Sequence, residues 1–197
     1  IPLRYHLQAG EVVTLPGVNT IADGTAVKTP GKNIFPYIRD NIDEIVTVPD
    51  EDLVVSFLDI VENHKMIVEN SGLLTVAALR HLDVKNKRIV SILSGGNMDI
   101  ITMSSVVQQG LIFRDRIFTV SVLLPDKPGE LTKVSEVIAS LHGNVIKLEH
   151  NQFVSINRNA AVELRITLET FGTEHKNQII KALEEKGYQP KQVRANI

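Results

Sequence analysis

Residues 162–169 read Val-Glu-Leu-Arg-Ile-Thr-Leu-Glu, in which apolar and polar side chains alternate without a break. Successive side chains of a β-strand point to opposite faces, so this period of two predicts a strand with one buried and one exposed face. Residues 117–124 alternate in the same way, with Phe118, Val120 and Val122 on one face. The chain therefore contains two predicted strands of the kind found in half-covered sheets.

Four further elements follow from the sequence around these strands. Apolar residues spaced three and four apart predict a helix over residues 131–141, and a second helix is predicted from Thr173 to Gly187. Residues 144–150 and 189–194 are the remaining predicted strands. The order βαββαβ predicts a ferredoxin-like α+β unit, in which both helices cover one face of an antiparallel four-stranded sheet. The open face favours pairing with a second copy or another domain.

The composition is that of a globular protein and excludes several classes of function. Hydrophobic residues make up 43% and charged residues 22% of the 197 residues, and the net charge is −2 without a basic face. We therefore expect no nucleic-acid partner. No apolar run is long enough to span a membrane, so we expect no membrane association and a cytoplasmic protein. Cysteine is absent and the six histidines are scattered, so no metal site is expected.

The chain is predicted to divide near residues 109–115 into two domains, residues 1–112 and residues 113–197. In the first domain, Pro49 is followed by three acidic residues, which predicts the start of a helix. A second helix is predicted over residues 71–82, where apolar side chains recur at helical spacing.

A short apolar segment in the first domain leads into a glycine loop. Residues 88–93 (RIVSIL) are predicted as a strand buried on both faces of a parallel sheet, which makes this domain α/β. The strand runs into residues 94–97 (SGGN), and the ligands of such sheets bind where strands end. A plain turn is the other interpretation of this Gly-Gly pair. Gly24 and Glu69 also have two interpretations. They either belong to a ligand site or are an ordinary turn residue and a surface acid.

A second candidate site lies in the loop before residues 131–141. Asp126 and Gly129 precede the predicted helix, whose first N–H groups and positive dipole attract a carboxylate. The Asp126 side chain can hold an ammonium group, so the loop suits an amino acid, which carries both charges. The alternative is a helix start in which Pro128 and Glu130 have structural roles only.

Three stretches of the second domain match a known pattern. They are the Asp126–Gly129 loop, residues 145–151 (VIKLEHN) and residues 168–175 (LETFGTEH). With this spacing residues 113–197 resemble an ACT domain, a regulatory module that binds amino acids, as found in bacterial threonine dehydratases. The open face of this sheet also favours a homo-oligomer formed through the ACT sheet. The resemblance implies an amino-acid effector bound by Asp126, Gly129, Glu130, Leu131 and Asn144.

Three stretches of the first domain carry a second resemblance. Residues 20–27 (TIADGTAV), 67–72 (IVENSG) and 90–97 (VSILSGGN) are similar to the C-terminal part of the catalytic domain of the same enzymes, which belong to the fold-type II pyridoxal-phosphate family. The resemblance implies pyridoxal 5'-phosphate as the cofactor of the parent enzyme. The implied cofactor-binding residues are Ser94, which would hydrogen-bond the ring nitrogen, and Gly95, Gly24 and Glu69.

By the same resemblance, two parts of a complete enzyme are missing. The family has its Schiff-base lysine in a Ser-Phe-Lys-like motif and its phosphate in a glycine-rich loop, and both precede the matching stretches. No lysine of this sequence lies in such a motif, and no run of three glycines occurs. The sequence begins at Ile1 without a Met or a signal peptide. We therefore expect a C-terminal portion of a threonine dehydratase, with no catalytic residue and no activity of its own.

Two functional hypotheses follow. In the first, the parent protein is a pyridoxal-phosphate lyase that converts L-threonine to 2-oxobutanoate and ammonia, and residues 113–197 regulate it allosterically. In the second, the chain is a stand-alone module for amino-acid binding or oligomerisation without catalysis. Turnover of threonine by the chain itself would exclude the second hypothesis.

Overall fold

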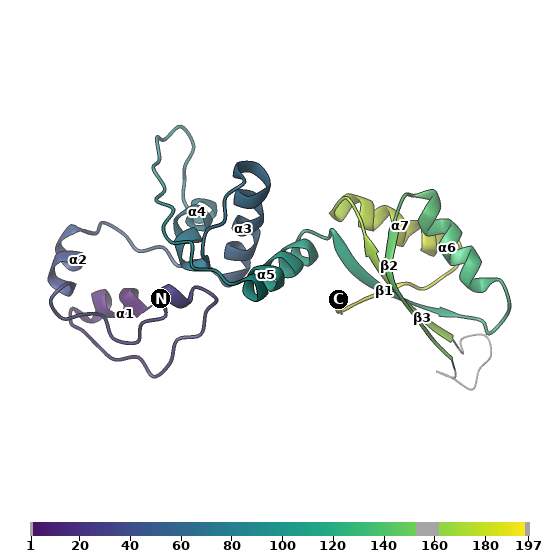
Figure 1. The fold of residues 1–197 in the computed structure, drawn as a ribbon, viewed down its shortest axis with the longest axis horizontal. Coiled ribbons are helices and arrows are strands. Elements are labelled where there is room, and N and C mark those ends of the chain that lie inside the picture. Colours follow the sequence, from purple (N-terminus) through teal and green to yellow (C-terminus); the bar gives the residue numbers. More distant parts are fainter. Residues whose placement is uncertain (1, 153–161, 196–197) are drawn as a thin grey trace. The chain divides into compact units, whose positions relative to one another are not determined.

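The computed structural model describes residues 2–152 and 162–195 (Figure 1). The chain consists of two compact units, Ile1–Gly110 and Leu111–Ile197. In residues 2–110 the structure describes helices and loops but no strand, and the sheet belongs to the second unit. No helix within the described residues is long and apolar enough to cross a membrane.

The second unit is a four-stranded sheet with two helices. Its strands lie in the order β2-β3-β1-β4, and every pairing is antiparallel. This confirms the predicted element order and the predicted antiparallel sheet. The elements are β1 (Ile117–Leu124), α6 (Glu130–Ser140), β2 (Asn144–Asn151), β3 (Val162–Glu169), α7 (Thr173–Glu185) and β4 (Lys191–Val193).

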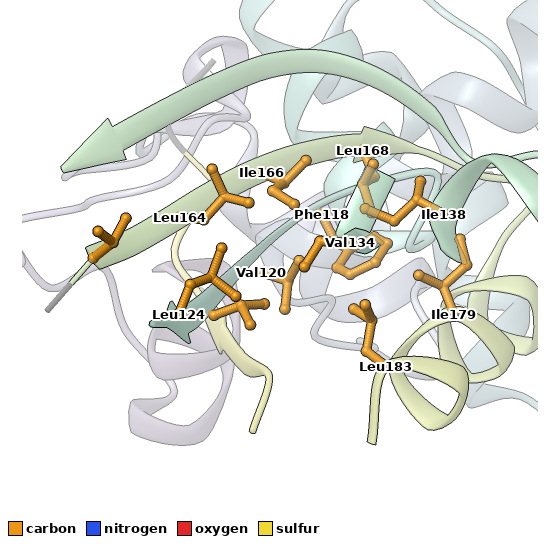
Figure 2. Close-up of a cluster of buried hydrophobic side chains, with 12 residues drawn as sticks. Phe118, Val120, Leu124, Val134, Ile138, Leu164, Ile166, Leu168, Ile179 and Leu183 are labelled. Atoms are coloured by element: carbon orange, nitrogen blue, oxygen red, sulfur yellow. The ribbon is translucent and has the colours of Figure 1, made fainter. Parts of the chain in front are cut away.

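One face of the sheet and both helices enclose an apolar core (Figure 2). Alternate residues of β1 and β3, among them Phe118, Val120 and Ile166, are buried there. Ile138 of α6 and Leu183 of α7 meet them from the helices. Burial of each large apolar side chain contributes roughly 1.5–3 kcal/mol. The period of two in the strands therefore also determines which face the helices cover.

Strand β2 contains an irregularity. Val145 pairs with Leu168 and the next pair is Lys147 with Thr167, so Ile146 is an extra residue in β2. Such a β-bulge bends the strand and changes which side chains share a face. Because Leu168 belongs to the core, the neighbouring Thr167 and its partner Lys147 lie on the face turned away from the helices.

The first unit is built from helices and loops. Helix α3 (Asp50–His64) begins directly after Pro49, as predicted, with three acidic residues in its first turn. Its buried side chains form an apolar core with residues that include Leu73 and Val106. The remaining elements are α1 (Pro2–Ala9), η1 (Asp23–Thr25), α2 (Phe35–Asn41), η2 (Asn70–Leu73), α4 (Leu74–Ala77), η3 (Ala78–His81) and α5 (Ile100–Phe113).

Two predicted elements of the first unit differ in the structure. The helix predicted over residues 71–82 is a succession of the short elements η2, α4 and η3. The prediction of a buried strand over residues 88–93 is wrong, since the segment is not a strand and Val90 is 91% exposed. An apolar run becomes a strand only when a neighbouring strand shares its backbone hydrogen bonds. The described part of the first unit provides no such neighbour, so the expected parallel sheet is not present in it.

Hydrogen bonds of Asp115 connect the start of β1 to α7. The Asp115 φ angle of 53° lies in the left-handed region, which residues other than glycine rarely adopt. Its carboxylate accepts hydrogen bonds from Thr173 Oγ1 (2.8 Å) and Lys176 Nζ (2.7 Å), and its carbonyl accepts one from Thr170 Oγ1 (2.5 Å). The Lys176 and Asp115 side chains are only 12% and 19% exposed. These contacts hold an unfavourable backbone conformation in place.

Replacing Lys176 with methionine keeps the side-chain length and leaves the shielded Asp115 carboxylate without its cation. We expect Lys176→Met to lower the free energy of unfolding of the second unit by roughly 1.5–3 kcal/mol. Urea unfolding followed by the amide NMR signals of β1 and β3 measures the change. Lys181→Met is the control on the same helix, because Lys181 and Glu185 are exposed and 3.8 Å apart. It should cost less than about 0.5 kcal/mol, and equal costs would contradict the role of Asp115.

Candidate functional site

Three loops of the first unit meet around the carboxylate of Glu69. Ser71 Oγ donates a hydrogen bond to Glu69 Oε1 (2.6 Å), and the backbone N–H of Asn97 donates one to Oε2 (3.3 Å). The backbone N–H of Glu69 donates to the carbonyl of Gly95 (3.4 Å). Gly24 contacts the same group from a third loop, since a Cβ atom built on it would lie 3.5 Å from Glu69 Oε1. The predicted residues Gly24, Glu69 and Gly95 therefore lie together.

The loop that carries Gly24 is positioned by Asp50 at the start of α3. The Asp50 carboxylate accepts hydrogen bonds from Thr20 Oγ1 (2.6 Å) and from the backbone N–H of Ile21 (3.0 Å). Asn70 Nδ2 donates to the carbonyl of Ile21 (3.1 Å), which ties this loop to the segment next to Glu69. Side chains outside the glycine loops thus determine where those loops meet.

Close approach of neighbouring groups requires glycine at positions 24, 72 and 95. A Cβ atom on Gly95 would overlap the carboxyl group of Glu69, and Gly95 has a φ angle of 79°. A Cβ atom on Gly24 would lie 2.7 Å from Ser71 Oγ, closer than real Cβ atoms come to other heavy atoms. At the neighbouring Gly96, by contrast, a Cβ atom would meet nothing within 4 Å. The cluster therefore needs glycine at some positions and tolerates it at others.

Ser94 lies at the exposed edge of this cluster. Its backbone carbonyl packs so closely against Gly72 that a Cβ atom there would overlap it, whereas the residue itself is exposed to solvent. Sequence reasoning missed Ser71 and Asn97 as the groups that hold Glu69. A signal for Ser71 was present, because a hydroxyl two residues from an acid commonly forms a local hydrogen bond.

The groups of the cluster fit a small heteroaromatic ring. Ser94 offers an exposed hydroxyl that can donate to a ring nitrogen, and beside Gly96 nothing lies within 4 Å of the position that a Cβ atom would take. Asn70 Oδ1 is buried and has no hydrogen-bond partner among the described residues, so acceptor capacity remains unused beside Glu69. Within residues 2–152 and 162–195, no group of three or more His, Cys, Asp or Glu can hold a metal ion.

The second candidate site lies in the second unit, at the N-terminus of α6. Gly129 has a φ angle of 91° there, and a Cβ atom on it would meet nothing within 4 Å. No side chain caps α6 in the described structure. The N–H of Glu130 donates to the carbonyl of Lys127 (3.5 Å), so the N–H groups of Leu131 and Thr132 are those available to a carboxylate. Asp126 lies in the same loop, and Leu131 in the first turn of the helix is 38% exposed. These three predicted residues share one open loop and helix start.

Glu130 interacts with two residues of its own unit, Lys133 and Tyr188. Glu130 Oε1 accepts a hydrogen bond from Lys133 Nζ (2.7 Å), and this bond raises the pKa of Lys133. Burial raises the pKa of the Tyr188 hydroxyl, and the negative charge of Glu130 raises it further. An effector contact of Glu130 stays a prediction, and such a contact would compete with these two neighbours.

Asn144 lies at the opposite end of the sheet from this loop. It opens β2 and pairs with Glu169, which pairs in turn with Ile117 at the start of β1. Asp126 follows the other end of β1, and at about 3.3 Å per residue the two ends are roughly 23 Å apart. Asn144 Nδ2 donates to Glu169 Oε2 (3.0 Å). One chain therefore does not bring Asn144 together with the other predicted effector residues.

Comparison with known proteins relates the chain to one group of enzymes. Residues 1–95 match the family described as pyridoxal-phosphate dependent enzyme. The L-threonine ammonia-lyase of Geobacter sulfurreducens is 38% identical over 187 residues, which cover 94% of this chain and 46% of that protein. The L-threonine ammonia-lyase of Thermotoga maritima is 32% identical over 184 residues, covering 93% of this chain and 46% of that protein. This chain thus spans about half the length of these curated relatives.

A solved structure shows the same relationship. The processed form of threonine deaminase isoform 2 from Solanum lycopersicum has a TM-score of 0.51 and 31% sequence identity to this chain. The likeness covers 54% of this chain and 32% of that chain.

Substituting Gly95 tests the close approach around Glu69. We expect Gly95→Ala to destabilise the first unit by at least roughly 1–2 kcal/mol, because alanine is strained in the left-handed region and its Cβ would displace the carboxylate. Urea unfolding measures the cost, and the amide NMR signal of Asn97 reports the loss of its hydrogen bond. Gly96→Ala is the matched control and should leave that signal in place. If both variants behave like the parent chain, Glu69 does not organise these loops.

Proposed function

We propose, from the match of residues 1–95 to the pyridoxal-phosphate dependent enzyme family, that the parent protein is a threonine ammonia-lyase. The proposed net reaction converts L-threonine to 2-oxobutanoate and ammonia, and the water lost by elimination is returned when the C–N bond is hydrolysed. Two relatives named L-threonine ammonia-lyase, matching 94% and 93% of the chain, support the choice of substrate. The observation that carries the proposal is the meeting of three loops around Glu69, at the positions that the family resemblance assigns to the cofactor.

Each residue of this cluster has a proposed task. Pyridoxal 5'-phosphate supplies the electron sink that the elimination needs. Ser94 is proposed to donate its hydroxyl to the ring nitrogen, because a neutral partner tolerates an unprotonated nitrogen and so moderates the sink. Gly24 and Gly95 are proposed to shape the cofactor pocket by leaving room for the Ser71 and Glu69 side chains beside the backbone. Glu69 is proposed to hold the two loops that carry Ser94 and Gly24.

The chain by itself is proposed to be inactive. Its sequence contains neither a lysine in a Ser-Phe-Lys-like motif nor a glycine-rich phosphate loop. The second candidate function, an amino-acid-binding or oligomerisation module, applies to this chain alone and is favoured by the open loop at Gly129.

The direct test uses the protein extended to the full length of its relatives. We expect it to show the absorbance of bound cofactor and to release keto acid from threonine in a coupled assay. The 197-residue chain, assayed in parallel, should release none. A full-length protein that acts on neither threonine nor serine would rule out the lyase, and turnover by the 197-residue chain would overturn its proposed inactivity.

We further propose that residues 113–197 are an ACT-type regulatory domain that works as a homo-oligomer. Strand β2 lies at one edge of the sheet and its residues are almost all exposed, and edge strands pair readily with a further strand. Antiparallel pairing of two β2 strands would place Asn144 of the second copy at the end of the sheet where Asp126 and Gly129 lie. The predicted effector residues would then be completed by two chains.

Titration of the chain with branched-chain amino acids, threonine and serine tests this site. For the amino acid that binds, we expect Asp126→Ala to raise Kd at least tenfold, because one charge-assisted hydrogen bond contributes roughly 1.5–3 kcal/mol. Glu174→Ala removes an exposed acid from the start of α7 and should leave Kd unchanged. Equal affinity of the Asp126→Ala variant and the parent chain would assign Asp126 a structural role only.

A further inference from the structure

The sheet face turned away from the helices carries a cavity of about 190 Å³, lined mainly by residues with polar or charged side chains. None of its lining residues belongs to the core in Figure 2 or to the loop around Gly129. The polar and charged residues that line it are Thr119, Lys147, Glu149, Arg165, Thr167 and Arg194.

Strand register explains why these residues meet. Lys147 pairs with Thr167, Thr167 with Thr119, and Thr119 with Val193, so one row of residues crosses all four strands. The bulge at Ile146 sets this register for β2. The two central strands contribute short side chains to the row and β2 contributes a long one. The result is a depression whose floor is formed by the hydroxyls of Thr119 and Thr167 and whose wall includes the charged side chain of Lys147.

The floor of the cavity has an unused hydrogen-bond donor. Thr119 and Thr167 are 5% and 3% exposed, and their Oγ1 atoms lie 2.8 Å apart. Each hydroxyl has one O–H donor, and their mutual bond uses only one of the two. Neither hydroxyl bonds to any other group in the described part of the chain. Buried donors are normally satisfied, so a group that accepts a hydrogen bond is expected above them.

The walls of the cavity carry an excess of positive charge. Lys147 forms an ion pair with Glu149 (3.1 Å), and Arg165 forms one with Glu163 (3.0 Å). Arg194 forms no ion pair with any of the described residues. Three cations therefore face two carboxylates, and a cavity with such an excess attracts anions.

We infer that this cavity binds a small oxyanion, a carboxylate or phosphate group that accepts a hydrogen bond from the Thr119–Thr167 pair and is bound by the guanidinium of Arg194. The planar fork of an arginine matches both kinds of oxyanion. A volume of about 190 Å³ has room for a phosphate ion or a small carboxylic acid. The site is separate from the proposed effector loop and does not depend on the lyase activity.

Amide NMR titration of the 197-residue chain tests this inference with two probes, inorganic phosphate and acetate, at constant ionic strength. We expect saturable shifts at Thr119, Thr167 and Val193 with at least one probe. Saturation by both probes indicates a general carboxylate and phosphate site, and saturation by phosphate alone indicates a phosphate site.

Two variants and one control identify the groups that bind. Arg194→Gln removes the guanidinium, and a double variant with Thr119→Val and Thr167→Val removes the hydroxyl floor with little change of shape. Each should weaken binding by roughly tenfold or more. Lys181→Gln removes one exposed positive charge from α7 and should change Kd by less than about twofold. The inference is overturned if neither probe saturates, if the shifts map to residues 126–131, or if Lys181→Gln weakens binding as much as Arg194→Gln.

Discussion

The carboxylate of Glu69 is the group around which the glycine loops of the first unit are arranged. Ser71 and the backbone of Asn97 hold its two oxygens, and the lack of a side chain at Gly95 lets the loop of residues 94–97 approach it. A carboxylate held by its neighbours keeps one orientation, so the loops around it keep theirs. Binding sites for rigid ligands need such support behind the residues that touch the ligand. Ser94, at the open edge of this supported loop, is the residue that we propose to meet the cofactor.

The second unit uses the two faces of its sheet differently. One face is closed by α6 and α7 over an apolar core, which gives the unit its stability. The other face keeps short hydroxyl residues on the central strands and charged residues around them. A face of this kind adds little to the stability of the fold through apolar burial. Its residues can therefore take part in ligand binding without a large loss of stability. The bulge at Ile146 links the two faces, because it sets which β2 side chains reach each of them.

The predictions from sequence were correct for elements whose burial produces a periodic pattern in the sequence. They failed for features that depend on which strand lies next to which. Alternation identified β1 and β3, since each strand buries one face. The apolar run over residues 88–93 suggested a strand for a similar reason, but a strand also needs a neighbour. Neither the bulge at Ile146 nor the separation of Asn144 from the proposed effector loop has a local sequence signal.

The candidate cofactor site was predictable only through family resemblance. Taken alone, Gly24, Glu69 and Gly95 each suit an ordinary turn or surface position, and their meeting depends on contacts such as Asp50 with Thr20. The central claim, that Ser94 faces the ring nitrogen of the cofactor, is tested most directly by ¹⁵N NMR of the full-length protein loaded with pyridine-¹⁵N-labelled pyridoxal phosphate. The account predicts an unprotonated nitrogen with Ser94 and a protonated one with Ser94→Asp. The same nitrogen shift in both proteins would contradict it.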